Sequence, residues 1–144
     1  MKLDLLDVNF LAVFVASIVG YAFNMIWYGP LFGKTWLKFS KWDPEELKKV
    51  PPKLMQIKFA IGYLQQIVLS YFLAVFLTAF KAETFAHILG FSFLLWLAFV
   101  AVIAFNSVLW ENHSVPFYTI NVSARLANFW VLSTIYFVVK NFAQ

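Results

Sequence analysis

The sequence predicts an all-α membrane protein, a polytopic bundle of four transmembrane helices. Hydrophobic residues make up 62% of the 144 residues and charged residues only 12%, whereas about a quarter of a soluble domain is charged. The mean hydropathy is +0.77, and the chain contains four apolar stretches of at least about 20 residues, enough to cross a hydrocarbon core about 30 Å thick. These stretches leave room for a single membrane domain over residues 1–144 and for no separate soluble domain.

The first apolar stretch predicts a helix with one face made of small residues. We expect the four spans at residues 8–28, 57–80, 85–110 and 115–139. In the first span Ala12, Ala16 and Gly20 recur at every fourth position, a pattern typical of close helix–helix contact in membranes. The preceding residues are acidic overall and lack a basic segment, which favours a retained helix over a cleaved signal peptide. Because glycine and proline interrupt helices, we expect Gly29-Pro30 to stop this one.

The connection over residues 29–56 is basic and predicts a short surface helix. Its lysines are Lys34, Lys38, Lys41, Lys48, Lys49 and Lys53. Asp43 is a typical N-cap and Pro44 a typical first helical residue, so we expect a helix from Asp43 to Lys49 that ends before Pro51-Pro52. The aromatic residues before Asp43 favour either a segment at the lipid interface or a solvated loop, and the sequence leaves both open.

Lysine counts predict the orientation in a cell (cytoplasmic) membrane. Cytoplasmic loops of membrane proteins carry an excess of lysine and arginine, and the connection over residues 29–56 is by far the most basic one. We therefore expect this loop inside the cell. An even number of spans then places both termini outside.

The later spans carry polar residues that should face the interior of the bundle. In the second span, Gln65 and Gln66 need a partner helix, either as hydrogen-bonding contacts between helices or as part of a site. In the fourth span, Asn121, Arg125 and Asn128 follow the i, i+4, i+7 spacing of one helical stripe. An arginine at this depth costs roughly 2.5–3.5 kcal/mol on insertion scales, so it is unlikely to face the acyl chains.

Arg125 is the centre of the predicted site. No intramembrane Asp or Glu lies at its level, so amides, carbonyls, water, another subunit or an anion must meet its charge. We expect the polar groups to outline a cavity that opens toward the cytoplasm and ends at the guanidinium. The candidate ligand-binding residues are Arg125, Asn121, Asn128, Gln65, Gln66 and Asn24.

The sequence favours no catalytic, metal or nucleic-acid function. The chain has no cysteine, which removes thiolate nucleophiles and cysteine-based metal sites. His87 has no second His, Asp or Glu on its helical face, so we expect no metal ligand there, and we expect no cofactor. The chain also lacks a nucleophile with an adjacent base and a carboxylate pair, so we do not expect an enzyme. No basic face for a nucleic acid is visible outside the spans.

Three classes of function stay open, and the least favoured of them is an intramembrane enzyme. The first is binding or transport of a small anionic or polar ligand at Arg125. The second is a structural or accessory subunit that packs with itself or with a partner in the lipid bilayer. Four spans are few for a monomeric carrier, so we expect a homo-oligomer in the first case. The ladder from Ala12 to Gly20 offers a surface for that self-association.

Several motifs carry a family resemblance. They are Trp27–Trp36 (WYGPLFGKTW), Gly90–Val100 (GFSFLLWLAFV), Asn106–Glu111 (NSVLWE) and an asparagine in the fourth helix. With them the sequence resembles domain-of-unknown-function family 1761, small four-helix and chiefly prokaryotic membrane proteins. The similarity extends from about Asn9 to Val139, and the first motif is its most specific part. The resemblance implies a polytopic membrane protein and brings no established activity.

Overall fold

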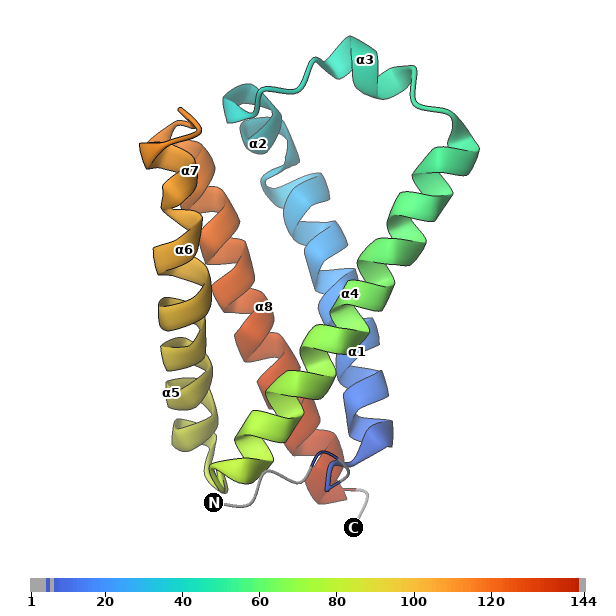
Figure 1. Ribbon diagram of the computed structural model, residues 1–144. Helices are drawn as coiled ribbons and strands as arrows, with labels where there is room; N and C mark the ends of the chain where they lie inside the picture. The colour runs from blue at the N-terminus through green and yellow to red at the C-terminus, as the bar shows by residue number, and fades with distance from the viewer. Residues whose placement is uncertain (1–4, 6, 143–144) are drawn as a thin grey trace.

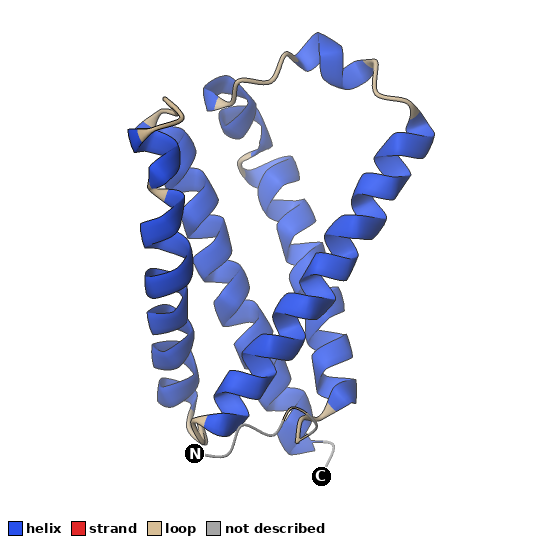
Figure 2. Ribbon diagram, viewed as in Figure 1, coloured by secondary structure: helices blue, strands red, loops and turns tan. Residues whose placement is uncertain are grey.

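Four long helices form the molecule and confirm the predicted all-α fold. A computed structural model describes residue 5 and residues 7–142. The helical segments long and apolar enough to cross a membrane are Phe10–Leu31, Pro52–Ala79, Phe85–Leu109 and Val115–Phe142. Figure 2 shows helices joined by short loops throughout the described part of the chain. By helix length and composition the protein is therefore a multi-pass membrane protein.

The four helices alternate in direction, and the last of them holds the others together. α1 (Phe10–Ile26), α4 (Pro52–Ala79) and α5 (Phe85–Trp96) surround α8 (Val115–Phe142), which packs most closely on α1 and then on α5. The hairpin between α4 and α5 lies at the same end as the start of α1 and the end of α8 (Figure 1). From this hairpin α4 and α5 diverge, and they share few contacts.

The ladder of small residues is the contact between α1 and the rest of the bundle. Ala12 and Ala16 are fully buried, and Gly20 is buried against α4 and α8. A Cβ atom on Gly20 would lie 2.7 Å from Leu132 Cδ2 and 2.9 Å from Asn128 Oδ1, so only glycine fits here. The prediction of close helix contact is confirmed. The prediction that the ladder serves self-association is wrong, because these residues are covered within one chain.

Polar bonds between helices add to this packing. Ser70 on α4 donates to the Val13 carbonyl at 2.9 Å, and the Ser92 and Ser133 hydroxyls on α5 and α8 lie 2.5 Å apart. The Trp96 indole donates to the Val122 carbonyl at 2.9 Å. In the absence of a hydrophobic driving force inside lipid, such bonds and close packing of small residues hold transmembrane helices together.

The first helix continues past Gly29-Pro30, contrary to the prediction. Trp27–Leu31 form a π-helical turn, η1, in which the Phe32 N–H donates to the Trp27 carbonyl at 2.8 Å. A proline lacks the N–H of an α-helical bond and its ring crowds the carbonyl four residues earlier, and a widened turn accommodates both. α2 (Gly33–Phe39) follows directly, and Gly33 is needed because a Cβ there would lie 2.5 Å from the Tyr28 carbonyl oxygen.

The basic connection contains the surface helix that the sequence predicts. α3 (Pro44–Lys48) begins after Asp43, whose side chain accepts a hydrogen bond from the Glu45 N–H at 2.9 Å. α4 then begins at Pro52, five residues before the predicted start of the second span. The aromatic segment before α3 is largely helical rather than a plain loop, and Trp36 of α2 packs on Phe117 of α8 with ring centroids 6.0 Å apart.

The third span also contains a π-helical turn. It begins as α5 and continues through η2 (Leu97–Ala101), α6 (Val102–Ala104) and α7 (Asn106–Leu109). The Tyr118 hydroxyl of α8 donates to the Ala101 carbonyl at 3.0 Å, at the end of that turn. Such supplementary bonds are how irregular helices remain satisfied inside a membrane.

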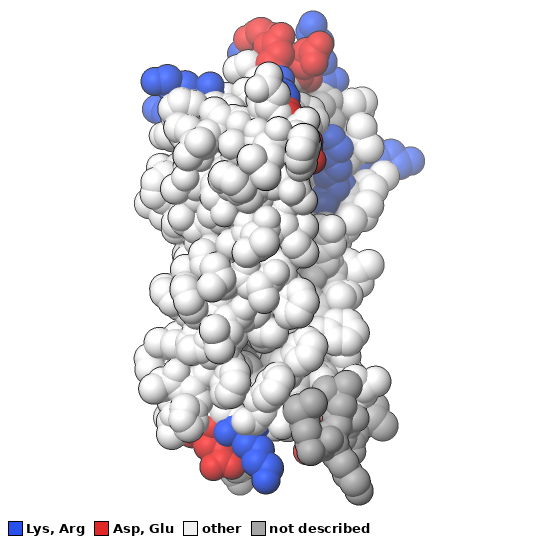
Figure 3. Space-filling model, turned by 60° about the vertical axis from the view of Figure 1, so that its left-hand side comes forward, with Lys and Arg blue, Asp and Glu red and all other residues white. Residues whose placement is uncertain are grey.

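Charged side chains gather at the two ends of the molecule. On the face seen in Figure 3, the broad middle carries no visible Lys, Arg, Asp or Glu, whereas both ends do. The end formed by α2, α3 and the start of α4 carries the cluster of lysines (Figure 1). This distribution is that of a protein whose middle lies in hydrocarbon and whose ends lie in water.

Candidate functional site

Three of the predicted site residues form a hydrogen-bonded amide cluster between α1, α4 and α8. Gln66 Nε2 donates to Asn128 Oδ1 at 3.0 Å, and Asn128 Nδ2 donates back to Gln66 Oε1 at 3.1 Å. Asn24 Nδ2 donates to the same Gln66 oxygen at 3.2 Å. Gln66 and Asn128 are buried, with 4% and 5% of their surfaces exposed. The amides therefore satisfy one another, which is the role of a packing contact.

A fourth predicted residue, Asn121, fastens the end of the first span to α8. Its Oδ1 accepts hydrogen bonds from the Tyr28 hydroxyl at 3.0 Å and from the Trp36 indole at 3.3 Å. Its Nδ2 donates to the Phe117 carbonyl of its own helix at 2.8 Å. All of these partners belong to the protein, so Asn121 acts in the structure as a clamp on η1 and α2.

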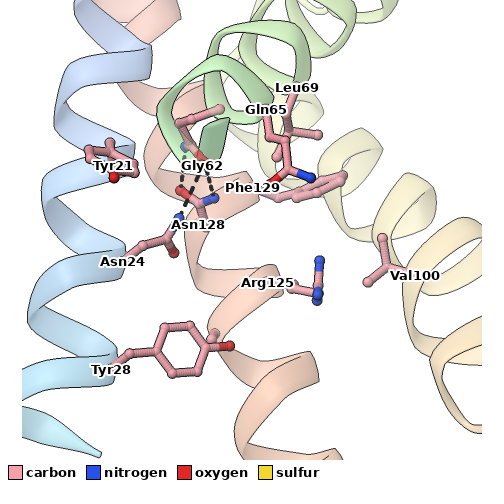
Figure 4. Close-up of a pocket in the computed structure, with 12 residues that line it drawn as sticks. Tyr21, Asn24, Tyr28, Gly62, Gln65, Leu69, Val100, Arg125, Asn128 and Phe129 are labelled. Carbon is pink, nitrogen blue, oxygen red and sulfur yellow. Dashed lines mark hydrogen bonds between the residues drawn. The ribbon is translucent and has the colours of Figure 1, made fainter. Parts of the chain in front are cut away.

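Arg125 lies apart from these amides. It is exposed in the structure, and among the described residues it has neither a salt bridge nor a hydrogen-bond partner. Figure 4 shows its side chain directed toward Val100 of η2, away from the Asn24–Gln66–Asn128 cluster. The predicted stripe is therefore divided in the structure, because Asn128 is buried in the cluster whereas Arg125 is exposed and turned toward η2. Gln65, the sixth predicted residue, is exposed and likewise lacks a hydrogen bond within the part of the chain described.

Arg125 and Gln65 nevertheless line one cavity together with the amide cluster. The cavity has a volume of about 480 Å³ and lies between α1, α4, η2 and α8. Its polar lining is Asn24, Gln65, Gln66, Arg125, Asn128, Tyr21 and Tyr28. Its apolar lining includes Gly62, Leu69, Val100 and Phe129. The structure thus brings five of the six predicted residues to one space, which is large enough for a small ligand.

Asn121 lines a second, smaller space on the other side of Arg125. This space has a volume of about 230 Å³ and includes Ser107 and Tyr118. Arg125 is common to both linings, so this residue borders both spaces.

Two tyrosines in the cavity were missed by the sequence reasoning. Tyr21 and Tyr28 both line it, and their hydroxyls donate to the Phe59 carbonyl and to Asn121. Tyr21 lies three residues before Asn24 and Tyr28 four residues after it, so the same helical spacing that singled out Asn24 could have identified them.

Comparison with protein families decides which group this chain belongs to. The family model described as "Protein of unknown function (DUF1761)" matches residues 11–137. The chain belongs to the DUF1761 family. This confirms the resemblance drawn from the sequence motifs. Comparisons with curated proteins and with solved structures found no match. The description of the DUF1761 family names no activity, so the chemistry of the cavity must be argued from its own residues.

The cavity of this DUF1761 protein supplies one cation and several neutral hydrogen-bonding groups. A guanidinium presents a planar fork of N–H donors that matches carboxylate and phosphate oxygens. Gln65 adds an amide that can donate or accept a hydrogen bond. The lining contains no Asp, Glu, His, Ser or Cys, so Arg125 is its charged group and amides and tyrosine hydroxyls supply its other polar atoms.

Proposed function

We propose that the cavity at Arg125 binds, and in the assembled protein transports, a small anionic or polar solute within the membrane. The observation that carries this proposal is an arginine in a membrane-spanning helix that faces a cavity of about 480 Å³ without a counter-charge among the described residues. A charge inside the membrane is costly, and charges found there face interior cavities and mark ligand or ion pathways.

The surrounding residues support an anion in particular. Arg125 lies ten residues after the start of α8, so the guanidinium is about 15 Å along the helix axis from that end. The same end of the molecule carries the lysines of α2, α3 and the start of α4. Cations at the mouth of a site raise the local concentration of anions and speed their association. We propose that this end faces the cytoplasm, in keeping with the positive-inside rule.

An accessory role is the second candidate, and a different observation favours it. Asn24, Gln66, Asn128 and Asn121 are all hydrogen-bonded within the chain, as polar contacts between packed helices are. In that case Arg125 would meet a group on a partner subunit. The two candidates differ in whether a small anion alone stabilises the isolated protein.

Thermal unfolding of the purified protein in a neutral detergent separates the candidates. Acetate or inorganic phosphate, added at constant ionic strength, should raise the melting temperature of the wild type and leave Arg125→Met unchanged. Without added anion, Arg125→Met should be as stable as the wild type or more stable, because an apolar side chain avoids the cost of desolvating a charge. Lys140→Met, at the far end of the same helix, is the matched control and should keep the response to anions.

A different pattern supports the accessory role. Arg125→Met should then leave the stability of the isolated protein about unchanged, because Arg125 has neither a hydrogen bond nor a salt bridge among the described residues. The wild type would show no shift with either anion. This combination rejects the binding proposal.

A further inference from the structure

An apolar groove adjoins the cavity that holds Arg125. It has a volume of about 270 Å³ and lies between α4 and the third span. Phe72 and Phe76 of α4 form one wall, and Leu95 and Phe99 form the other. The helices that form its walls diverge from their hairpin (Figure 1), and the wall residues Phe72, Phe76 and Phe99 are exposed on the apolar outer surface of the bundle.

Two side chains belong to the lining of both this groove and the cavity. Leu69 and Phe129 line both spaces. Phe99, which lines the groove, and Val100, which lines the cavity, are neighbours in η2. The polar cavity and the apolar groove are therefore adjacent, and a ligand that extends from the guanidinium past Phe129 would have its two ends in the two spaces. This arrangement fits a molecule with a charged head and a hydrocarbon tail.

We propose that the ligand of this site is an anionic amphiphile with a single hydrocarbon chain. Its head group, an oxyanion with one negative charge, pairs with Arg125, and its chain lies in the groove between α4 and α5. This inference rests on the function proposed above and names the class of ligand. One guanidinium without a second cation in the cavity lining matches a singly charged head group.

The size of the groove matches one chain of moderate length. A volume of about 270 Å³ is on the order of nine times the 30 Å³ that one water molecule occupies in the liquid, and a methylene group occupies a similar space. The groove therefore offers space for about nine methylene groups, the size of the alkyl part of a ten-carbon carboxylate. Each methylene group removed from water contributes about a fourfold gain in affinity. A ten-carbon chain should bind far more tightly than acetate, which offers the head group alone.

Decanoate, acetate and decanol are the probes that test this inference. Their effects on the melting temperature are compared between the wild type and the variants in one neutral detergent. Each probe then partitions into the micelles to the same extent in every sample. In the wild type, decanoate should raise the melting temperature at a concentration at least about tenfold below the concentration of acetate that gives the same shift. Decanol, which has the chain without the charge, should produce no comparable shift. Arg125→Met should lose the response to both anions.

Two substitutions on neighbouring residues test the groove itself. Leu95→Trp fills the groove, so the decanoate concentration needed for a given shift in melting temperature should rise about tenfold or more. The response to acetate should stay intact. Leu94→Trp is the matched control, because Leu94 is 58% exposed and does not line the groove. If Leu95→Trp does not fold, Phe72→Trp on the opposite wall makes the same test, since Phe72 is exposed and its position admits a larger ring.

The outcomes separate failure of this inference from failure of the proposed function. If acetate and decanoate raise the melting temperature at equal concentrations, the hydrocarbon chain of the ligand does not occupy the groove. The same conclusion follows if Leu94→Trp weakens the response to decanoate as much as Leu95→Trp does. In both cases the small-anion site at Arg125 remains. If decanol raises the melting temperature as much as decanoate does, or if Arg125→Met keeps its response to decanoate, the head group of the ligand does not pair with Arg125. If neither anion shifts the wild type, both proposals fail.

Discussion

Gln66 and Asn128 exchange two hydrogen bonds across the interface of α4 and α8, with donor–acceptor distances of 3.0 and 3.1 Å. Both side chains are buried beside Gly20, and the arrangement satisfies one donor and one acceptor of each amide. The pair joins the second and fourth spans at the level of the cavity. It therefore holds in place the helix that carries Arg125.

The losses of stability on removing Gln66 and Asn128 should not be additive. Gln66→Leu leaves the Asn128 amide buried without its partner, so we expect a loss of about 1–3 kcal/mol in the free energy of unfolding. The double variant Gln66→Leu/Asn128→Leu should lose less than the sum of the single variants, because polar contacts between membrane helices average about 0.6 kcal/mol. Reversible unfolding in mixed micelles measures these values.

Gln65 provides the control for that comparison. It is adjacent in sequence, exposed, and has no hydrogen bond within the described residues, so Gln65→Leu should change stability by less than about 0.5 kcal/mol. A loss at Gln65 equal to that at Gln66 would contradict the assignment of the packing role to Gln66.

Gly20 should tolerate substitution far less well than Gly90. In Gly20→Ala the new Cβ would meet Leu132, Asn128 and, closest of all, Gln66 Nε2, so the helices must separate or the amide pair must break. We expect a loss of about 1–3 kcal/mol from this overpacking. Gly90→Ala is the control, because a Cβ on Gly90 has nothing within 4 Å, and it should stabilise α5 by about 0.5–1 kcal/mol. Equal effects of the two substitutions on thermal stability would contradict this account of Gly20.

The spans and the close contact of α1 were predictable from sequence because each follows from a local rule. Length and apolar composition predict a membrane helix, and small residues at every fourth position predict a close contact. Asp43 likewise predicted α3, because an N-cap acts within one turn of its own residue. Whether Pro30 would end the first helix was not predictable. Proline lacks a backbone N–H, and both a helix end and a π-helical turn accommodate it.

The site was predictable only as a set of residues, and their division into two groups was not. At about 100° per residue, Arg125 is rotated by about 40° from Asn121 in one direction, and Asn128 by about 20° in the other. That difference of about 60° is enough for Asn128 to face α1 and α4 while Arg125 faces η2. Similarly, Gln65 and Gln66 lie about 100° apart, so only one of them can meet Asn128. Which side of a stripe meets which neighbour depends on tertiary packing.

Asn121 should be required for the docking of α2 on α8. In Asn121→Leu the Trp36 indole and the Tyr28 hydroxyl lose their common acceptor, so we expect amide hydrogen exchange in Gly33–Phe39 to become faster. The expected loss of global stability is about 1 kcal/mol, because both donors are only half-buried. Thr119→Val is the control, since the Thr119 hydroxyl donates to the Val115 carbonyl of its own helix. Unchanged exchange in α2 of Asn121→Leu would show that other contacts dock this segment.

The orientation in the membrane is the last prediction, and single cysteines test it because the chain has none of its own. Lys48→Cys lies in α3, at the end of the molecule that carries the lysine cluster. Glu83→Cys in the α4–α5 hairpin and Asn141→Cys near the end of α8 lie at the opposite end, and both positions are exposed.

A membrane-impermeant maleimide applied to intact cells should label Glu83→Cys and Asn141→Cys, and should label Lys48→Cys only after the membrane is permeabilised. The physical reason is that lysines next to a span are retained on the cytoplasmic side. Labelling of Lys48→Cys and Asn141→Cys from the same side would contradict the four-span arrangement itself. Labelling of Lys48→Cys alone in intact cells would keep four spans and invert them. In that case the lysines at the mouth of the Arg125 cavity would attract anions from outside the cell.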